Sequence, residues 1–306
     1  MSAHDARTLL TEATARAGDR PALTYRHAGT GERTEFGYRT FANWVTKAAD
    51  ACNFEGLAPD ETCQVATDGH WAGLVAVWAA GLLGATALLD TDGQGRSSAR
   101  PPVLAVLADG RATSTATRVC TVGTGLGGRR TDGAGEAFVD LAASGADVLD
   151  LDGPGPQQRW LDWPAAAAAP GSLLAAGPPA TQAQVCAAAA AVAQACRPAR
   201  RALLTVALDS PEGVHASVAA VTLGAQLIAT VGSDPVDWAR IAGQEHADVL
   251  LTDRAGLAAL LARDLQAPCP QLVCLDAPAA GQAEEAAQRW GVPLVVPVGQ
   301  DADRSV

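Results

Sequence analysis

One arrangement of strands and helices occurs twice in this sequence, and it restricts the fold more than any other feature. The first copy spans residues 62–90 and the second spans residues 203–230. Each copy reads as a short strand, a turn that opens with aspartate, an apolar helix, Leu-Gly-Ala and another strand. Gly84 and Gly224 stand where a helix C-cap is expected. Helices that are apolar on most faces and alternate with short strands are typical of a parallel sheet covered on both sides. We therefore predict an α/β fold.

Segments of the same kind flank the two copies. Residues 21–38 read as two β-rich runs around a turn that contains glycine, which predicts a hairpin. A helix should follow, because apolar residues recur at spacings of three and four, at Phe41, Trp44, Val45 and Ala48. A third unit is predicted downstream, with strands at 249–252, 271–276 and 292–298 and helices at 254–265 and 281–290.

The segment between the two copies carries weaker signals. Strand patterns are found at 103–107, 118–122 and 147–151. An exposed loop is predicted at residues 93–101, and residues 153–172 read as a connection rich in proline and alanine that includes Trp160 and Trp163.

Residues 123–128 fit the G-x-G-x-x-G pattern of dinucleotide-binding sites. Such a site needs a helix that starts at the glycines, so that its amides meet the pyrophosphate. The residues that follow, G-R-R-T-D-G-A-G, cannot begin a helix promptly. We favour a flexible loop, and a NAD or nucleotide-sugar enzyme is the weakest of the functional hypotheses.

The composition excludes several classes of partner. A net charge of −11 argues against nucleic acid and anionic membranes, because phosphate binding needs clustered cations. The N-terminus lacks the apolar segment of a signal peptide, and the longest apolar runs are too short to span a bilayer. We expect a soluble, cytoplasmic protein.

The seven cysteines and five histidines form no recognisable metal or catalytic motif. No C-x-x-C pair occurs, and Cys269 and Cys274 have no nearby histidine to complete a zinc site. There is also no G-x-S-x-G, H-E-x-x-H or Walker A sequence. We expect buried, reduced thiols, no metal site and no catalytic residue.

The opening hairpin, helix, strand, buried helix and Gly-Ala-strand resemble the start of the adenylate-forming superfamily, which includes acyl-CoA synthetases, luciferases and peptide-synthetase adenylation domains. Residues 31–47, G-x-R-x-E-(x)₄-T-x-A-N-W-V-x-K, are similar to a short AMP-ligase-like family of unknown function from high-GC Gram-positive bacteria. The resemblance implies a two-lobed α/β fold of mainly parallel sheets, like the large N-terminal domain of these enzymes without the small C-terminal domain. The lobes would comprise residues 56–185, and residues 1–55 plus 200–306.

The resemblance also places a phosphate-binding loop, roughly T-S-G-T-T-G-x-P-K-G, within residues 172–185. This chain reads A-A-G-P-P-A-T-Q-A-Q-V there, and Gly177 alone fits the pattern. Pro178 and Pro179 remove two amide donors, and Ala183 stands where lysine would be. Gly177 and Thr181 are the candidate cofactor-binding residues of this degenerate loop. We favour a structural strand-to-helix turn with Thr181 as the N-cap.

Other signature positions of the superfamily are equally altered. Its aromatic/His substrate-gate segment should fall at residues 207–215, where the sequence is A-L-D-S-P-E-G-V-H, and we interpret His215 as a structural histidine. The Y-G-x-T-E element should follow residue 298, where Asp301 and Asp303 are predicted to lie in a solvated tail. The resemblance implies that the ribose-binding aspartate, the hinge and the domain with the catalytic lysine would lie beyond residue 306.

His70 and Trp71 are the second pair of candidate residues. They lie at a strand-to-helix turn, and such turns at the carboxyl edge of a parallel sheet are where α/β proteins usually bind ligands. A possible cleft there competes with a simpler interpretation, a helix start with aromatic packing, which we favour.

Two functional hypotheses follow. The first is a catalytically inactive relative of the adenylate-forming enzymes that serves as a binding or interaction module for an unknown protein partner. It needs no cofactor, although remnant ATP or AMP binding is compatible with it. The second is an acyl-adenylate-forming or AMP-binding enzyme whose partner chain supplies the missing domain.

Overall fold

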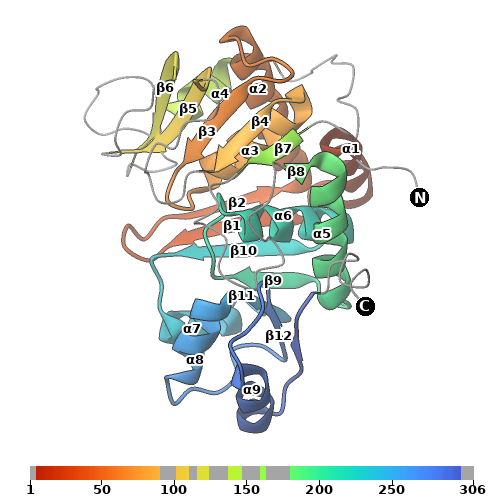
Figure 1. Ribbon diagram of the computed structural model, residues 1–306, viewed down its shortest axis with the longest axis vertical. Coiled ribbons are helices and arrows are strands. Elements are labelled where there is room, and N and C mark those ends of the chain that lie inside the picture. The colour runs from red at the N-terminus through yellow and green to blue at the C-terminus, as the bar shows by residue number, and fades with distance from the viewer. Residues whose placement is uncertain are drawn as a thin grey trace.

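A computed structural model describes residues 5–89, 101–109, 116–123, 137–146, 159–162 and 180–297. These residues form two sheets covered by helices, which lie one above the other in Figure 1. The predicted α/β fold with mainly parallel sheets is confirmed. Gly177, Asp301 and Asp303, the strand predicted at 147–151 and most of the glycine motif at 123–128 lie outside the described residues.

The large sheet has seven strands in the order β13-β12-β11-β9-β10-β1-β2 among the described residues. Its neighbours pair in parallel except for β1 and β2, which form the predicted hairpin. The strands are β1 (Pro21–His27), β2 (Arg33–Gly37), β9 (Arg201–Leu204), β10 (Gln226–Val231), β11 (Val249–Thr252), β12 (Gln271–Cys274) and β13 (Leu294–Val295).

The small sheet has six strands in the order β6-β5-β3-β4-β7-β8, again within the described ranges. Only β7 and β8 pair antiparallel. The strands are β3 (Thr62–Ala66), β4 (Thr86–Leu89), β5 (Leu104–Ala108), β6 (Arg118–Val122), β7 (Arg159–Asp162) and β8 (Ala180–Thr181).

The interpretation of residues 153–172 as a connection is wrong at Trp160. This residue lies in β7 and is fully buried, and its indole Nε1 donates a hydrogen bond to the Val77 carbonyl at 3.0 Å. A large aromatic side chain with a satisfied N–H is a favourable core residue, which outweighs the loop-like composition around it.

The helices are α1 (Ala6–Ala17), α2 (Tyr38–Phe54), α3 (Trp71–Leu83), α4 (Phe138–Ser144), α5 (Gln182–Ala195), α6 (Pro211–Leu223), α7 (Pro235–Glu245), α8 (Arg254–Leu261) and α9 (Gln282–Trp290). The sequence did not predict α1 or α7, and α8 is shorter than expected. Among the described residues, no helix combines the length and the apolar character that crossing a bilayer requires.

The repeated sequence pattern corresponds to two similar units, β3-α3-β4 and β9-α6-β10. Each helix has 13 residues and ends at a glycine in the left-handed conformation, Gly84 with φ 72° and Gly224 with φ 66°. Every residue of α3 is buried, and the indole Nε1 of Trp78 donates to the Ser217 hydroxyl of α6 at 3.1 Å. One apolar cluster contains residues of both units, so the two sheets share a core.

Candidate functional site

The two predicted parts of the site lie at opposite edges of the small sheet. Thr181 pairs with Arg159, the first residue of β7, at the edge where the parallel strands begin. His70 follows β3 at the edge where they end. The Gln182 side-chain Nε2 donates to the Gly81 carbonyl in the last turn of α3 at 2.9 Å, whereas His70 caps the first turn. At 1.5 Å per residue, about 16 Å of helix lies between these positions.

Thr181 is the N-cap of α5, as predicted, and its polar groups are used within the helix start. Its hydroxyl accepts a hydrogen bond from the Gln184 amide, and the Gln184 side chain accepts from the Thr181 backbone, which completes a capping box. The next residue, Gln182, is fully buried and accepts a hydrogen bond from the Ala6 amide at 2.9 Å. This start of α5 is therefore closed by its own side chains and by α1 and α3.

His70 and Trp71 face Glu32, which lies between β1 and β2. The His70 Nδ1 accepts a hydrogen bond from the Ala72 amide at 3.1 Å, so the ring nitrogen that bears a proton is Nε2. Nε2 lies 3.5 Å from Glu32 Oε2, an electrostatic contact, and it has no hydrogen-bond partner among the described residues. The Trp71 indole donates to Glu32 Oε1 at 3.2 Å.

Glu32 is a nearly buried carboxylate, with 7% of its side chain exposed. Burial acts to raise its pKa, but the His70 imidazole, the Thr34 hydroxyl at 2.9 Å and the Trp71 indole outweigh burial. The pKa of Glu32 is therefore lowered, and the side chain is charged near neutral pH.

Asp209 lies beside this group and comes from the other repeated unit, between β9 and α6. Its carboxylate accepts hydrogen bonds from the Thr67 amide at 2.5 Å, the Thr67 hydroxyl at 2.8 Å and the Gly69 amide at 2.8 Å. The residue is 2% exposed. It joins the end of a strand in the large sheet to the end of a strand in the small sheet.

Tyr25 completes the group on the β1 side. Its ring meets the His70 ring edge-on, with centroids 4.9 Å apart. Burial raises its pKa, and the charges of Glu32, Asp209 and Asp68 raise it further. We call this set the intersheet junction, and it consists of Tyr25, Glu32, Thr67, Gly69, His70, Trp71 and Asp209. The junction is packed with its own side chains.

Further carboxylates lie beyond Asp209 at the carboxyl edge of the large sheet, where open α/β sheets usually bind ligands. Glu212 lies in the first turn of α6, and Asp253 and Asp276 follow β11 and β12. Burial raises the pKa of Glu212, and the nearby charges of Asp276 and Asp253 add to the rise. Asp276 also accepts a hydrogen bond from the Arg254 amide at 2.6 Å. Three carboxyl groups therefore lie at this edge.

The remaining candidate residues have structural surroundings. His215 is buried in α6 with Nδ1 2.5 Å from the Pro211 carbonyl, and burial lowers its pKa to about 4. Lys47, the only lysine in the sequence, lies on α2 and contacts the Ala143 carbonyl at 3.4 Å. In the described part of the chain, no three metal-ligating side chains gather closely enough to hold an ion.

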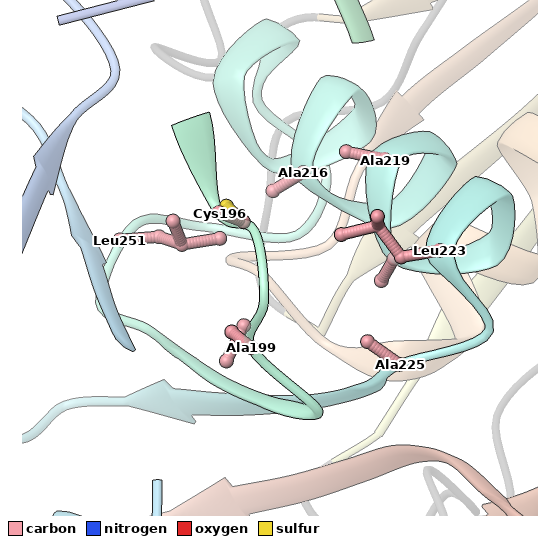
Figure 2. Close-up of a pocket in the computed structure, with 9 residues that line it drawn as sticks. Cys196, Ala199, Ala216, Ala219, Leu223, Ala225 and Leu251 are labelled. Carbon is pink, nitrogen blue, oxygen red and sulfur yellow. The ribbon is translucent and has the colours of Figure 1, made fainter. Parts of the chain in front are cut away.

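Figure 2 shows a small cavity beside α6, with a volume of about 10 Å³. It is lined by small or apolar side chains: Cys196, Ala199, Ala202, Ala216, Ala219, Ala220, Leu223, Ala225 and Leu251. A cavity of this size has room for about one water molecule, and its lining offers no polar side chain except a thiol. It is a packing gap in the core, too small for a substrate.

Comparisons with known proteins rest on structure alone. No family model matches the chain, and no curated protein matches its sequence. A long-chain-fatty-acid-CoA ligase (FadD1) from Archaeoglobus fulgidus superposes with a TM-score of 0.75 at 11% identity, over 96% of this chain and 64% of that one. The fold of the chain described here is therefore that of the N-terminal domain of acyl-CoA ligases.

Other solved ligases superpose similarly. A fatty acyl-CoA synthetase from Mycobacterium tuberculosis gives a TM-score of 0.70 at 14% identity, over 99% of this chain and 63% of that one. O-succinylbenzoate coenzyme A synthetase (MenE) from Bacillus subtilis was solved in complex with AMP. It gives a TM-score of 0.68 at 14% identity, over 94% of this chain and 71% of that one. The chain spans less than two thirds of the first of these structures, and identities this low show the fold alone.

Sequence reasoning missed Glu32 and Asp209 as members of one group. A signal for Asp209 was present, because both repeated copies have a turn that opens with aspartate. Its partner Thr67 is 142 residues away, so no local pattern could connect the two residues. Glu32 lies in a hairpin turn, where a carboxylate is ordinarily exposed.

Proposed function

We propose that this protein is a catalytically inactive member of the adenylate-forming superfamily that acts as a binding or interaction module. Within that superfamily we place it beside the short AMP-ligase-like family of high-GC Gram-positive bacteria. We further propose that it works in the cytoplasm through a protein partner. The observation that carries the proposal is the start of α5, where the superfamily resemblance puts the phosphate-binding loop.

A phosphate cradle needs free amide donors, hydroxyls and positive charge. Pro178 and Pro179 have no amide hydrogen, and Ala183 has no charge. The Thr181 hydroxyl is engaged with Gln184 in the capping box. Losing the donors and the cation that stabilise transferring phosphate costs several kcal/mol of transition-state stabilisation, about 3 kcal/mol for each donor.

Electrostatics at the large sheet support the same conclusion. Asp253 and Asp276 place carboxylates at the edge where a ligand of this fold would be expected, and their charges help burial to raise the pKa of the neighbouring Glu212. Like charges repel each other in a partly buried site, so these carboxylates disfavour a triphosphate bound close to them. The only lysine of the sequence, Lys47, lies on α2.

Isothermal titration calorimetry tests the proposal directly. The purified protein is titrated with ATP, AMP and a non-hydrolysable acyl-adenylate analogue, with and without magnesium. The Bacillus subtilis synthetase, whose solved structure holds AMP, serves as the positive control. We expect no heat of binding from this protein, and binding at micromolar strength would overturn the proposal.

Micromolar binding would favour the second hypothesis, a nucleotide-binding enzyme that depends on a partner chain. A restored variant, Pro178→Gly with Pro179→Thr and Ala183→Lys, sharpens the result. If the altered loop explains the lack of binding, this variant gains measurable affinity for AMP while the natural chain does not.

A further inference from the structure

The buried carboxylate of Asp209 is bound by the turn at residues 67–69, which follows a strand of the other sheet. What we infer from this contact goes beyond the proposed function and does not depend on whether a nucleotide binds. Both Asp209 oxygens are used. Oδ2 accepts from the amide and hydroxyl of Thr67, and Oδ1 accepts from the Gly69 amide. Three donors from one short turn therefore converge on a single anion, as in the backbone nests that bind carboxylates and phosphates.

The backbone of the turn is shaped for this contact. Asp68 has φ 54° and Gly69 has φ 80°, two successive left-handed residues. At Gly69 a Cβ atom would lie 3.1 Å from Ala207 Cα and 3.1 Å from Val231 Cγ2, so only glycine lets the two turns approach this closely. The close approach brings the Asp209 carboxylate within reach of the donors.

The charge of Asp209 is compensated by neutral groups. Within the described ranges, its hydrogen-bond partners are Thr67 and Gly69, and no side-chain cation pairs with it. A buried carboxylate is costly unless it is fully hydrogen-bonded, and hydrogen bonds to a charged acceptor are about twice as strong as neutral ones. The turn therefore binds the carboxylate as it would bind an anionic ligand.

We propose that the turn formed by residues 67–69 is a carboxylate-binding nest and that Asp209 is its resident intramolecular ligand. The bound carboxylate latches the large sheet to the small sheet. If the side chain is shortened, the three donors face a space the size of the missing group. The emptied nest then accepts a small external carboxylate. Formate matches the carboxylate that Asp209→Ala removes, and acetate matches the carboxylate and methylene group that Asp209→Gly removes.

The test compares Asp209→Ala with Asp209→Gly by thermal unfolding. Each variant is titrated with sodium formate and with sodium acetate, and sodium chloride at the same ionic strength is the control. We expect both variants to unfold at least about 5 °C below the natural chain. Formate should restore the larger part of this loss in Asp209→Ala, and acetate in Asp209→Gly, whereas chloride should restore neither.

Equal effects of chloride and the carboxylates, or an unchanged midpoint in Asp209→Ala, would overturn the proposal. If Asp209→Ala does not fold in chloride, refolding it in formate gives the same test, because only an occupied nest should yield folded protein. Asp209→Asn provides a variant of equal size. Its NH₂ group cannot accept from the turn, whereas its remaining oxygen can, so hydrogen exchange should accelerate by about tenfold or more at whichever of the Thr67 and Gly69 amides faces the NH₂ group. Unchanged exchange there contradicts the latch.

Discussion

The two repeated units start their helices in different ways. In both, a 13-residue helix follows a short strand, ends at a left-handed glycine and carries a glycine at its third position, Gly73 or Gly213. The start of α6 is closed by its own turn, because the Ser210 hydroxyl accepts from the Gly213 amide at 3.0 Å. The start of α3 has a local cap in His70 and is held in addition by distant residues, since Asp209 binds its turn and Glu32 binds Trp71.

This difference shows how two similar sequences can have unequal roles. The unit β9-α6 supplies both its own cap and the carboxylate that its counterpart needs. The unit β3-α3 supplies donors, and the carboxylate that its turn binds comes from the other unit.

The largest expected effect separates the two third-position glycines. In Gly213→Ala the new Cβ would lie 2.0 Å from the Ala207 carbonyl oxygen, a backbone atom with little freedom to move. In Gly73→Ala it would meet the Thr67 hydroxyl at 2.1 Å, a side-chain atom that can rotate away. Urea denaturation should show a loss of about 3 kcal/mol for Gly213→Ala and about 2 kcal/mol for Gly73→Ala.

Thr67→Ala should relieve part of the cost of Gly73→Ala, and no such rescue should exist for Gly213→Ala. Gly243→Ala on α7 is the matched control, because no atom lies within 4 Å of its Cβ position and an exposed helical alanine is favoured over glycine by about 0.5–1 kcal/mol. An equal loss of unfolding free energy in Gly73→Ala and Gly213→Ala would mean that the starts of the two helices are equally rigid.

An intermediate effect is expected at Glu32, and it should depend on pH. Its folded pKa is lowered, so its contribution is present above the unfolded value of about 4.3 and is lost as pH falls through the folded value. Glu32→Gln removes this contribution. Its free energy of unfolding should fall by about 2 kcal/mol at pH 7, and the difference from the natural chain should shrink below pH 4 or so.

Denaturant titrations of both proteins over this pH range provide the measurement. Glu12→Gln, on the exposed side of α1, should change the free energy of unfolding by less than about 0.5 kcal/mol at pH 7. If the free energy of unfolding of Glu32→Gln stays below that of the natural chain by the same amount at every pH, the loss of stability comes from packing and not from charge.

The smallest effect is expected at the self-contained start of α6. Ser210→Ala removes the acceptor for the Gly213 amide and should cost about 1 kcal/mol of unfolding free energy. Ser210→Asn, another good N-cap residue, should retain most of the stability. If Ser210→Ala destabilises the protein as much as Asp209→Ala does, then the local cap of α6 matters as much as the distant carboxylate at the start of α3, and the two helix starts do not differ in the way described above.

The fold could be predicted because local patterns specify it. The apolar run of α3 and the caps at Gly84 and Gly224 give elements whose bounds match the structure. The helix α1 was missed because its sequence, A-R-T-L-L-T-E-A-T-A-R-A, has few large apolar residues, and its buried stripe includes Leu9 and Leu10. The helix α7 opens with Asp234 and Pro235, an N-cap residue followed by proline at the first helical position, which is a local start signal in the sequence.

The candidate site was only partly predictable, for a physical reason. The caps at Thr181 and His70 depend on residues within three positions, so the sequence around them is informative. The contacts of Asp209 with Thr67 and of Glu32 with Trp71 bridge 142 and 39 residues. Such pairs are set by how the sheets pack, and that information is not present in any short segment.

The pairing of β1 with β10 has a consequence for the order in which the protein can be completed during synthesis. Leu23 lies opposite Leu227, whereas all strands of the small sheet come from residues 62–181. The small sheet can therefore assemble before β10 has left the ribosome, while the hairpin made first waits for its neighbour with one strand edge unpaired. An early, exposed edge of this kind is a site for aggregation or chaperone binding, so the hairpin is made before the small sheet but is secured after it.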